Sequence, residues 1–170
     1  MSKQRSRRAL KFDDLPSTVT EVEHLQRVGY SMVGRWNLAK ACQHLSKTLR
    51  MSIEGSPFQL PSLLQPIARR VLFQTAMRGE PTRLPLKTAR QFRPDEAPDA
   101  SESIAEYATL VERVVSKDAP LLDVHPVFGR ISKSEWRSFH AWHAAHHMSF
   151  LIPHDSNSNT NELIHETVEA

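Results

Sequence analysis

The stretch that decides the fold is residues 38–53, which read LAKACQHLSKTLRMSI. Apolar side chains recur there every three or four positions, which is the spacing of one face of an α-helix. Asn37 precedes the stretch as an N-cap, and the turn residues GSP follow it at 55–57. The sequence therefore predicts a helix over 37–54, with an apolar stripe made by Leu38, Ala41, Leu45, Thr48, Leu49 and Ile53.

Outside this helix, the same spacing marks four further segments, and no run with the period of a strand occurs. These segments are residues 17–30, 61–79, 101–118 (with Ser101 as the expected N-cap) and 132–152. Four prolines between residues 80 and 100 predict a long proline-rich loop there. We therefore expect an all-α fold, an antiparallel four-helix bundle with the extra short helix 61–79 lying across it; its core helices are 17–30, 37–54, 101–118 and 132–152.

The composition of the 170 residues, with 39% hydrophobic and 24% charged, is that of one globular domain. We place this domain at 13–153, after a basic, flexible arm over 1–12 and before a polar tail over 154–170. Much of the net charge of +3 lies in the arm. A basic arm can contact nucleic acid, but helices without a basic stripe weigh against nucleic acid as a partner.

The cellular compartment is inferred from the cysteine count and from the N-terminal residues. Cys42 is the only cysteine, which rules out an intrachain disulfide and suits a reducing compartment. The residues SRRALK resemble a twin-arginine export signal, but an acidic, polar segment follows them instead of an apolar one. No stretch of about 18 apolar residues is present. We therefore expect a cytoplasmic protein that does not enter a membrane.

Four of the nine histidines lie in HAWHAAHHMSFL, residues 140–151. At about 100° per residue, a helix brings His140, His143 and His147 to one face, with His146 off its edge. The pair His143 and His147 has the i, i+4 spacing with which two imidazoles reach one metal ion. His44, on or near the apolar stripe of 37–54, is the candidate third ligand. The alternative is a hydrogen-bonded core histidine at 44 and a solvated face on the last helix.

Two segments together resemble the DinB-like, or YfiT-like, metal-binding superfamily, and within it a bacterial family of unknown function. They are RWNLAKACQHLSKTLRMSIEG at 35–55 and HPVFGRISKSEWRSFHAWHAAHHMSF at 125–150. The first segment matches the motif W-x-L-x(5)-H-L, which begins at Trp36. The second segment matches a motif that begins with H-P-x-F-G at His125 and ends with the histidine pair His146–His147. An R-x-L-x-F start is also present at 8–12.

This resemblance implies a four-helix bundle with a metal ion, usually zinc or nickel, held by three histidines. By position these are His44, His143 and His147. Some members of the superfamily transfer a low-molecular-weight thiol, which implies a thiol or another small molecule as substrate. Phe150 departs from the pattern, because several relatives have glutamine or histidine there.

The remaining residues of the motifs have less defined roles. His140 is the candidate proton acceptor, or a hydrogen-bond partner of a metal ligand, because it lies on the same helix face as His143 and His147. His125 is expected to fix the start of the last helix through a hydrogen bond, and His146 to cap that helix or to face solvent. Trp136 and Trp142 are expected in the core or at an interface. Cys42 points away from His44 and is a poor ligand.

Two classes of function stay open on the sequence alone. The first is a metal-dependent thiol transferase or hydrolase, in which the ion lowers the pKa of a bound thiol or water. The second is a non-catalytic helical bundle that keeps a structural or vestigial histidine site. A homodimer is compatible with both.

Overall fold

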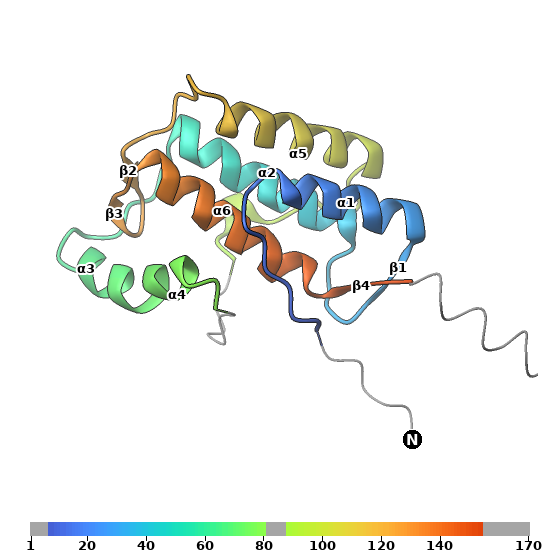
Figure 1. Cartoon of the computed structure of the whole chain (residues 1–170). Helices are drawn as coiled ribbons and strands as arrows, with labels where there is room; N and C mark the ends of the chain where they lie inside the picture. The colour runs from blue at the N-terminus through green and yellow to red at the C-terminus, as the bar shows by residue number, and fades with distance from the viewer. Residues whose placement is uncertain (1–6, 81–87, 155–170) are drawn as a thin grey trace, which may run out of the picture.

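The computed structural model describes residues 7–80 and 88–154, and this part of the chain is mostly helical (Figure 1). Its long helices are α1 (Ser17–Val28), α2 (Leu38–Glu54), α5 (Ala100–Val115) and α6 (Lys133–Met148). A shorter helical segment runs through α3 (Gln65–Ala68), the π-helical η1 (Arg69–Phe73) and α4 (Gln74–Met77), and η2 (Arg90–Phe92) is a 3-10 turn. The prediction of a helical fold is confirmed.

Side-chain caps fix where three of the long helices begin. Asn37 accepts a hydrogen bond from the Lys40 amide at 2.9 Å, as expected for the start of α2. Ser132 and Glu135 form a reciprocal capping box at the start of α6. Helix α5 is capped by Asp99 and not by Ser101, because extended backbone at Asp99 lets its carboxylate accept from the Glu102 amide at 2.8 Å.

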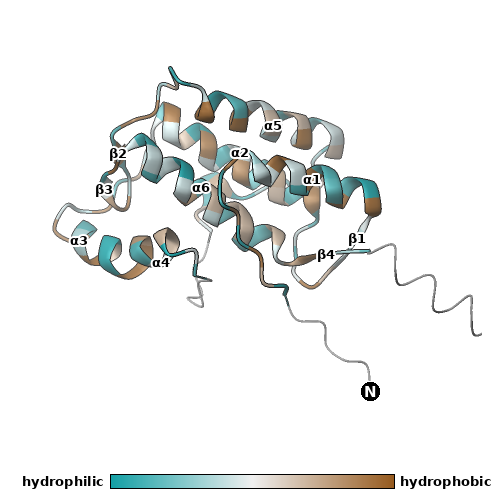
Figure 2. Ribbon diagram, in the orientation of Figure 1, coloured by the Kyte–Doolittle hydropathy of each residue, from teal (hydrophilic) through white to brown (hydrophobic). Residues whose placement is uncertain are grey.

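Helix α2 lies at the centre of the packing and contacts α1, α5 and α6, while α4 contacts α6 (Figure 1). The hydrophobic residues of the helices turn toward these contacts, and hydrophilic residues turn away from them (Figure 2). Some buried polar atoms in the core are paired with each other or with the backbone. The hydroxyls of Thr18 and Tyr107 lie 2.7 Å apart, and the Trp136 indole N–H donates to the Leu122 carbonyl at 2.6 Å. The largest fully buried side chains include Trp136, Tyr107, Phe73, Leu15, Leu25, Leu49 and Met148.

The end of the last helix differs from the prediction. Helix α6 ends at Met148, and β4 (Leu151–Pro153) pairs antiparallel with β1 (Tyr30–Met32). The predicted helix to residue 152 and the expectation of no strand are both wrong here. Proline disfavours helical backbone in the residue before it, so Pro153 favours an extended chain at the end of this segment.

A second two-stranded sheet lies between α5 and α6. It pairs β2 (Val124–His125) with β3 (Gly129–Arg130) in an antiparallel register. Gly129 has a positive φ of 71°, which a residue with a Cβ adopts at a cost. This tight turn holds residues 125–128 against the start of α6.

Residues 7–12, which we assigned to the arm, contact the helices. The Arg8 amide donates to the Ser149 carbonyl at 3.0 Å, and the Arg8 guanidinium pairs with Glu21. Leu10 and Phe12 pack against the hydrophobic core. The rest of the arm (1–6), part of the proline-rich loop (81–87) and the tail after residue 154 lie outside the described residues.

In the described parts of the chain, no helix combines the length and the apolar character needed to cross a membrane.

Candidate metal centre

Three imidazole rings from two helices meet at one point. His44 comes from the middle of α2, and His143 and His147 come from the last two turns of α6. The Nε2 atom of His143 lies 3.2 Å from that of His44 and 3.1 Å from that of His147. One ligand atom from each residue lies within 4.8 Å of the others. Two nitrogens bound tetrahedrally to zinc at 2.0–2.1 Å stand about 3.3 Å apart, so the spacing around His143 is that of a metal site.

The hydrogen bonding of His44 presents the correct nitrogen to this point. Its Nδ1–H donates to the Phe92 carbonyl at 2.7 Å, which leaves Nε2 with a free lone pair. Burial lowers the pKa of His44, although the bond to Phe92 opposes this effect. Metal ligands in proteins are oriented by such bonds from the other ring nitrogen.

Burial keeps the other two imidazoles neutral. It is the main cause that holds the pKa of His143 and of His147 well below 6.5, and the neighbouring histidines add to it. Neutral imidazole is the form that binds a metal ion. At neutral pH the cluster therefore offers three uncharged nitrogen donors.

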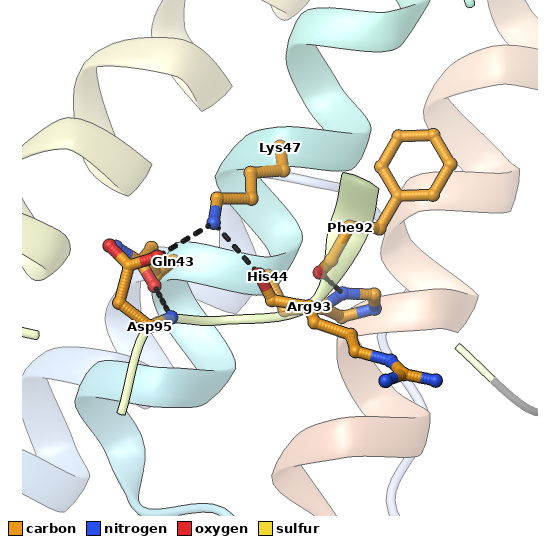
Figure 3. Close-up of polar contacts among 6 residues, drawn as sticks. All are labelled: Gln43, His44, Lys47, Phe92, Arg93 and Asp95. Atoms are coloured by element: carbon orange, nitrogen blue, oxygen red, sulfur yellow. Dashed lines mark hydrogen bonds and ion pairs between the residues drawn. The ribbon is translucent and has the colours of Figure 1, made fainter. Parts of the chain in front are cut away.

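A polar clamp holds the Phe92 carbonyl over His44 (Figure 3). The Gln43 amide group donates to the Asp95 carboxylate at 2.7 Å and accepts from the Asp95 backbone amide at 2.7 Å. One turn further along α2, the Lys47 ammonium donates to the Arg93 carbonyl at 2.8 Å. The bond that the carboxylate accepts from Gln43 lowers the pKa of Asp95, and the bond and charge of Lys47 add to this effect. The segment 92–95 is thereby fixed along α2 on either side of the histidine.

Aromatic rings surround the cluster on its other sides. The Trp36 indole stacks on His147, with ring centroids 5.1 Å apart and an interplanar angle of 15°. The Phe139 ring stacks on His143 at 5.8 Å. His146 meets His147 edge-on at 4.9 Å and stacks on Trp142. These contacts limit the rotation of the two α6 ligands.

Two cavities of different character adjoin the cluster. All three histidines line a cavity of about 370 Å³, whose wall is otherwise largely apolar. A more open groove of about 810 Å³ touches His147 and carries charged side chains, Arg35, Lys40, Arg93, Asp95 and Glu96. His146 and Thr88 line both. A bound ion would therefore be reached from an apolar side and from a charged side.

Comparison with known proteins identifies the family but no activity. The sequence profile of the family described as "Protein of unknown function (DUF1569)" matches residues 4–154. The chain belongs to the DUF1569 family. A search of curated proteins and a search of solved structures found no match. Membership of the DUF1569 family therefore assigns no activity to the chain.

Of the site residues predicted for this DUF1569 chain, the three ligand candidates come together and His140 does not join them. His140 is 2% exposed and stacks on Trp136 at 5.4 Å. Burial lowers its pKa to about 3. Within residues 7–80 and 88–154, it lines neither of the two cavities beside the cluster. Its role as a proton acceptor stays a prediction without support from this placement.

The other predicted residues take structural places. His125 Nδ1 accepts from the amides of Val127 and Phe128 at 3.0 and 3.3 Å, which fixes the turn before α6. Cys42 is fully buried, and burial raises its pKa to about 12. Trp136 is a core residue, whereas the Trp142 indole donates to the Glu80 carbonyl and lines the apolar cavity.

Three contributions to the site were missed by sequence reasoning. The Phe92 carbonyl could not be predicted, since a backbone acceptor has no signal in the side-chain pattern. The Trp36 stack on His147 was not predicted, because it joins residues that lie far apart in the sequence. One part of the clamp could have been predicted from the sequence. Gln43 and Lys47 are four residues apart, so their side chains share a face of α2.

Proposed function

We propose that His44, His143 and His147 bind one divalent metal ion, zinc or nickel, within a DinB-like bundle formed by α1, α2, α5 and α6. The observation that carries this proposal is the contact of three neutral Nε2 atoms. The Nε2 of His143 faces the other two and has at most one proton to donate between them. His44 brings a lone pair and no proton on that atom. A shared cation satisfies all three nitrogens at once, and a hydrogen bond does not.

The donor set fits a catalytic ion better than a purely structural one. Structural zinc sites have four protein ligands, whereas catalytic sites have three and keep one position for water or substrate. Within the described residues, the group that could hold an ion contains these three histidines. An ion held there would lower the pKa of a bound thiol or water.

We propose metal-dependent transfer of a thiol to an electrophile as the reaction class, with hydrolysis as the second candidate. No aspartate or glutamate lines the apolar cavity in the described parts of the chain, so no carboxylate base faces that side. A thiol, with a pKa of about 8.5, needs less help to lose its proton than water, with a pKa of about 15.7. His146 lines both cavities and is better placed than His140 to accept that proton.

The role of the chain in this reaction is to bind and to orient. The clamp on Phe92 holds His44 in one tautomer, and Trp36 limits the motion of His147. The largely apolar wall offers few partners to water on the side where a substrate would approach. A substrate that displaces water there would strengthen electrostatic interactions at the ligands.

The test is the metal content of protein purified without a histidine tag. We expect about one zinc or nickel ion per chain, and a chain with His44, His143 and His147 all replaced by alanine should contain none. His24→Ala is the control, because His24 lies on α1 and contacts Arg27. Equal metal content in the triple variant would refute the assignment.

Metal-loaded protein should then be screened with small thiols paired with electrophiles and, separately, with esters. A metal-dependent rate that His143→Ala removes supports an enzyme. Stoichiometric metal without any such rate favours the non-catalytic site.

A further inference from the structure

The cavity that the three histidines share carries no formal charge in its described wall. Its volume is about 370 Å³, and it is lined by side chains such as Met51, Leu72, Val127, Phe139 and Trp142. They come from α2, η1, the turn between β2 and β3, and α6. Among the described residues, no aspartate, glutamate, lysine or arginine lines it. This contrasts with the neighbouring groove, which three basic and two acidic residues line.

Several polar groups in the wall already have partners within the protein. The Thr48 hydroxyl donates to the Leu45 carbonyl at 2.8 Å. The Ser56 hydroxyl accepts from the Phe58 amide at 3.2 Å. The Nδ1 of His125 accepts from two backbone amides, which leaves only its Nε2 without a partner among the described residues. A charged guest would thus lose its hydration without gaining an opposite charge, which is costly.

The size of the cavity limits the guest. An apolar cavity of about 150 Å³ holds benzene, which has six carbon atoms. By proportion, about 370 Å³ holds roughly 15 non-hydrogen atoms. This value lies at the small end of the range of ligand pockets, about 300–1,000 Å³. A fused two-ring molecule is therefore of the right size.

We propose that this cavity binds an uncharged, largely apolar molecule of about 15 non-hydrogen atoms and brings it to the histidine cluster. As a substrate, this molecule depends on the proposed metal-dependent function, and it would be the electrophile or the ester. Its binding as such depends only on the cavity and does not require the ion. A charged part of a bound molecule would lie in the open groove, whose wall carries charged side chains, and not in this cavity.

The first experiment compares three probes of one shape on metal-free wild-type protein by titration calorimetry. The probes are 1-naphthalenemethanol, 1-naphthoate and 1-naphthylmethylammonium. We expect the neutral alcohol to bind at least about tenfold more tightly than either ion, because each ion loses hydration in an uncharged wall. An ion that binds as tightly as the alcohol, or an alcohol that does not bind, overturns the proposal.

The second experiment fills the cavity. Leu72→Trp places a larger ring on a lining residue, and Leu63→Trp makes the same change at a position that is 84% exposed and outside the wall. We expect the first variant to weaken binding of the alcohol at least about tenfold and the second to change it less than about twofold. Equal effects of the two variants contradict the cavity as the binding site. If Leu72→Trp does not fold, the probe series on wild-type protein still decides the question.

The two proposals fail in different ways. A wild-type chain that takes up metal but binds no alcohol overturns the cavity proposal and leaves the metal site. A chain that binds the alcohol but takes up no metal overturns the proposed function and leaves the cavity.

Discussion

Two groups of histidines lie near helix α6, and they differ in what their nitrogens meet. In the first group, the Nε2 atoms of His44 and His147 both contact the Nε2 of His143 beside a cavity. In the second, His125 and His140 are 3% and 2% exposed, whereas of the first group only His44 is as deeply buried. Yet both nitrogens of His140 and the Nε2 of His125 have no hydrogen-bond partner among the described residues.

This difference shows that burial alone does not mark a metal site. Burial lowers the pKa in both groups, and to about 3 for His125 and His140. What sets the first group apart is that its lone pairs converge and that a backbone carbonyl fixes the tautomer of His44. Both groups pack against aromatic rings, so these contacts do not distinguish them.

The largest effect expected from this comparison is on metal affinity. His143→Ala should weaken metal binding by more than about 100-fold, since loss of an outer-shell partner alone costs about 10–100-fold. His140→Ala, three positions away on the same helix, should change it much less. Competition with a chelating dye measures both affinities. Similar losses in the two variants would erase the distinction between the groups.

The next effect is on the pH dependence of stability. Burial lowers the pKa of His140 in the folded chain to about 3, from a usual 6.5. Below pH 6.5, His140 is therefore protonated in the unfolded chain and stays neutral in the folded chain. As the pH is lowered between these values, the free energy of unfolding should therefore decrease by about 1.4 kcal/mol per pH unit because of this residue. His140→Phe should remove that part of the slope. Urea unfolding of metal-free protein between pH 6.5 and 4.5 measures it, and parallel slopes for wild type and variant would contradict the burial argument.

The smallest effect concerns the clamp. Asp95→Ala removes the carboxylate that accepts from Gln43 and Lys47. Segment 92–95 then keeps only its bonds through backbone atoms to α2, and the Phe92 carbonyl is held less firmly over His44. We expect a loss of metal affinity of about tenfold, the low end for outer-shell partners. Asp123→Ala is the matched control, because Asp123 forms an exposed ion pair with Arg130 away from the cluster. Nitrogen NMR shifts of the His44 ring should show a mixture of tautomers in the first variant only.

The helical spacing of apolar residues predicted the long helices, because each buries one continuous face. The same spacing placed His143 and His147 on one side of α6, and the apolar stripe placed His44 on the inner side of α2. The ends of elements were harder to predict. The choice of Asp99 over Ser101 as a cap, and of a strand over a helical turn at 151–153, depends on local competition within a few residues.

The parts of the site that could not be predicted come from long-range contacts. His140 lies at the same helical angle as the ligands, yet it faces Trp136 and the core because α6 presents successive turns to different neighbours. The rule of about 100° per residue gives the direction of a side chain around the helix axis, but it does not say which part of the protein packs against each turn. The apolar cavity likewise depends on α2, η1 and α6 being brought together, and no single segment predicts it.

The pairing of β1 with β4 has a consequence for how the protein is made. The cluster spans 99 residues from His44 to His143, and strand β1 pairs with a strand that follows His147. At about 5–20 residues per second, a ribosome needs about 5 to 20 seconds to add the second histidine after the first. During that interval the growing chain offers one of the three ligands. Stable capture of the ion must therefore await the last part of the described chain, and β4 then ties the end of α6 to the segment that carries Trp36.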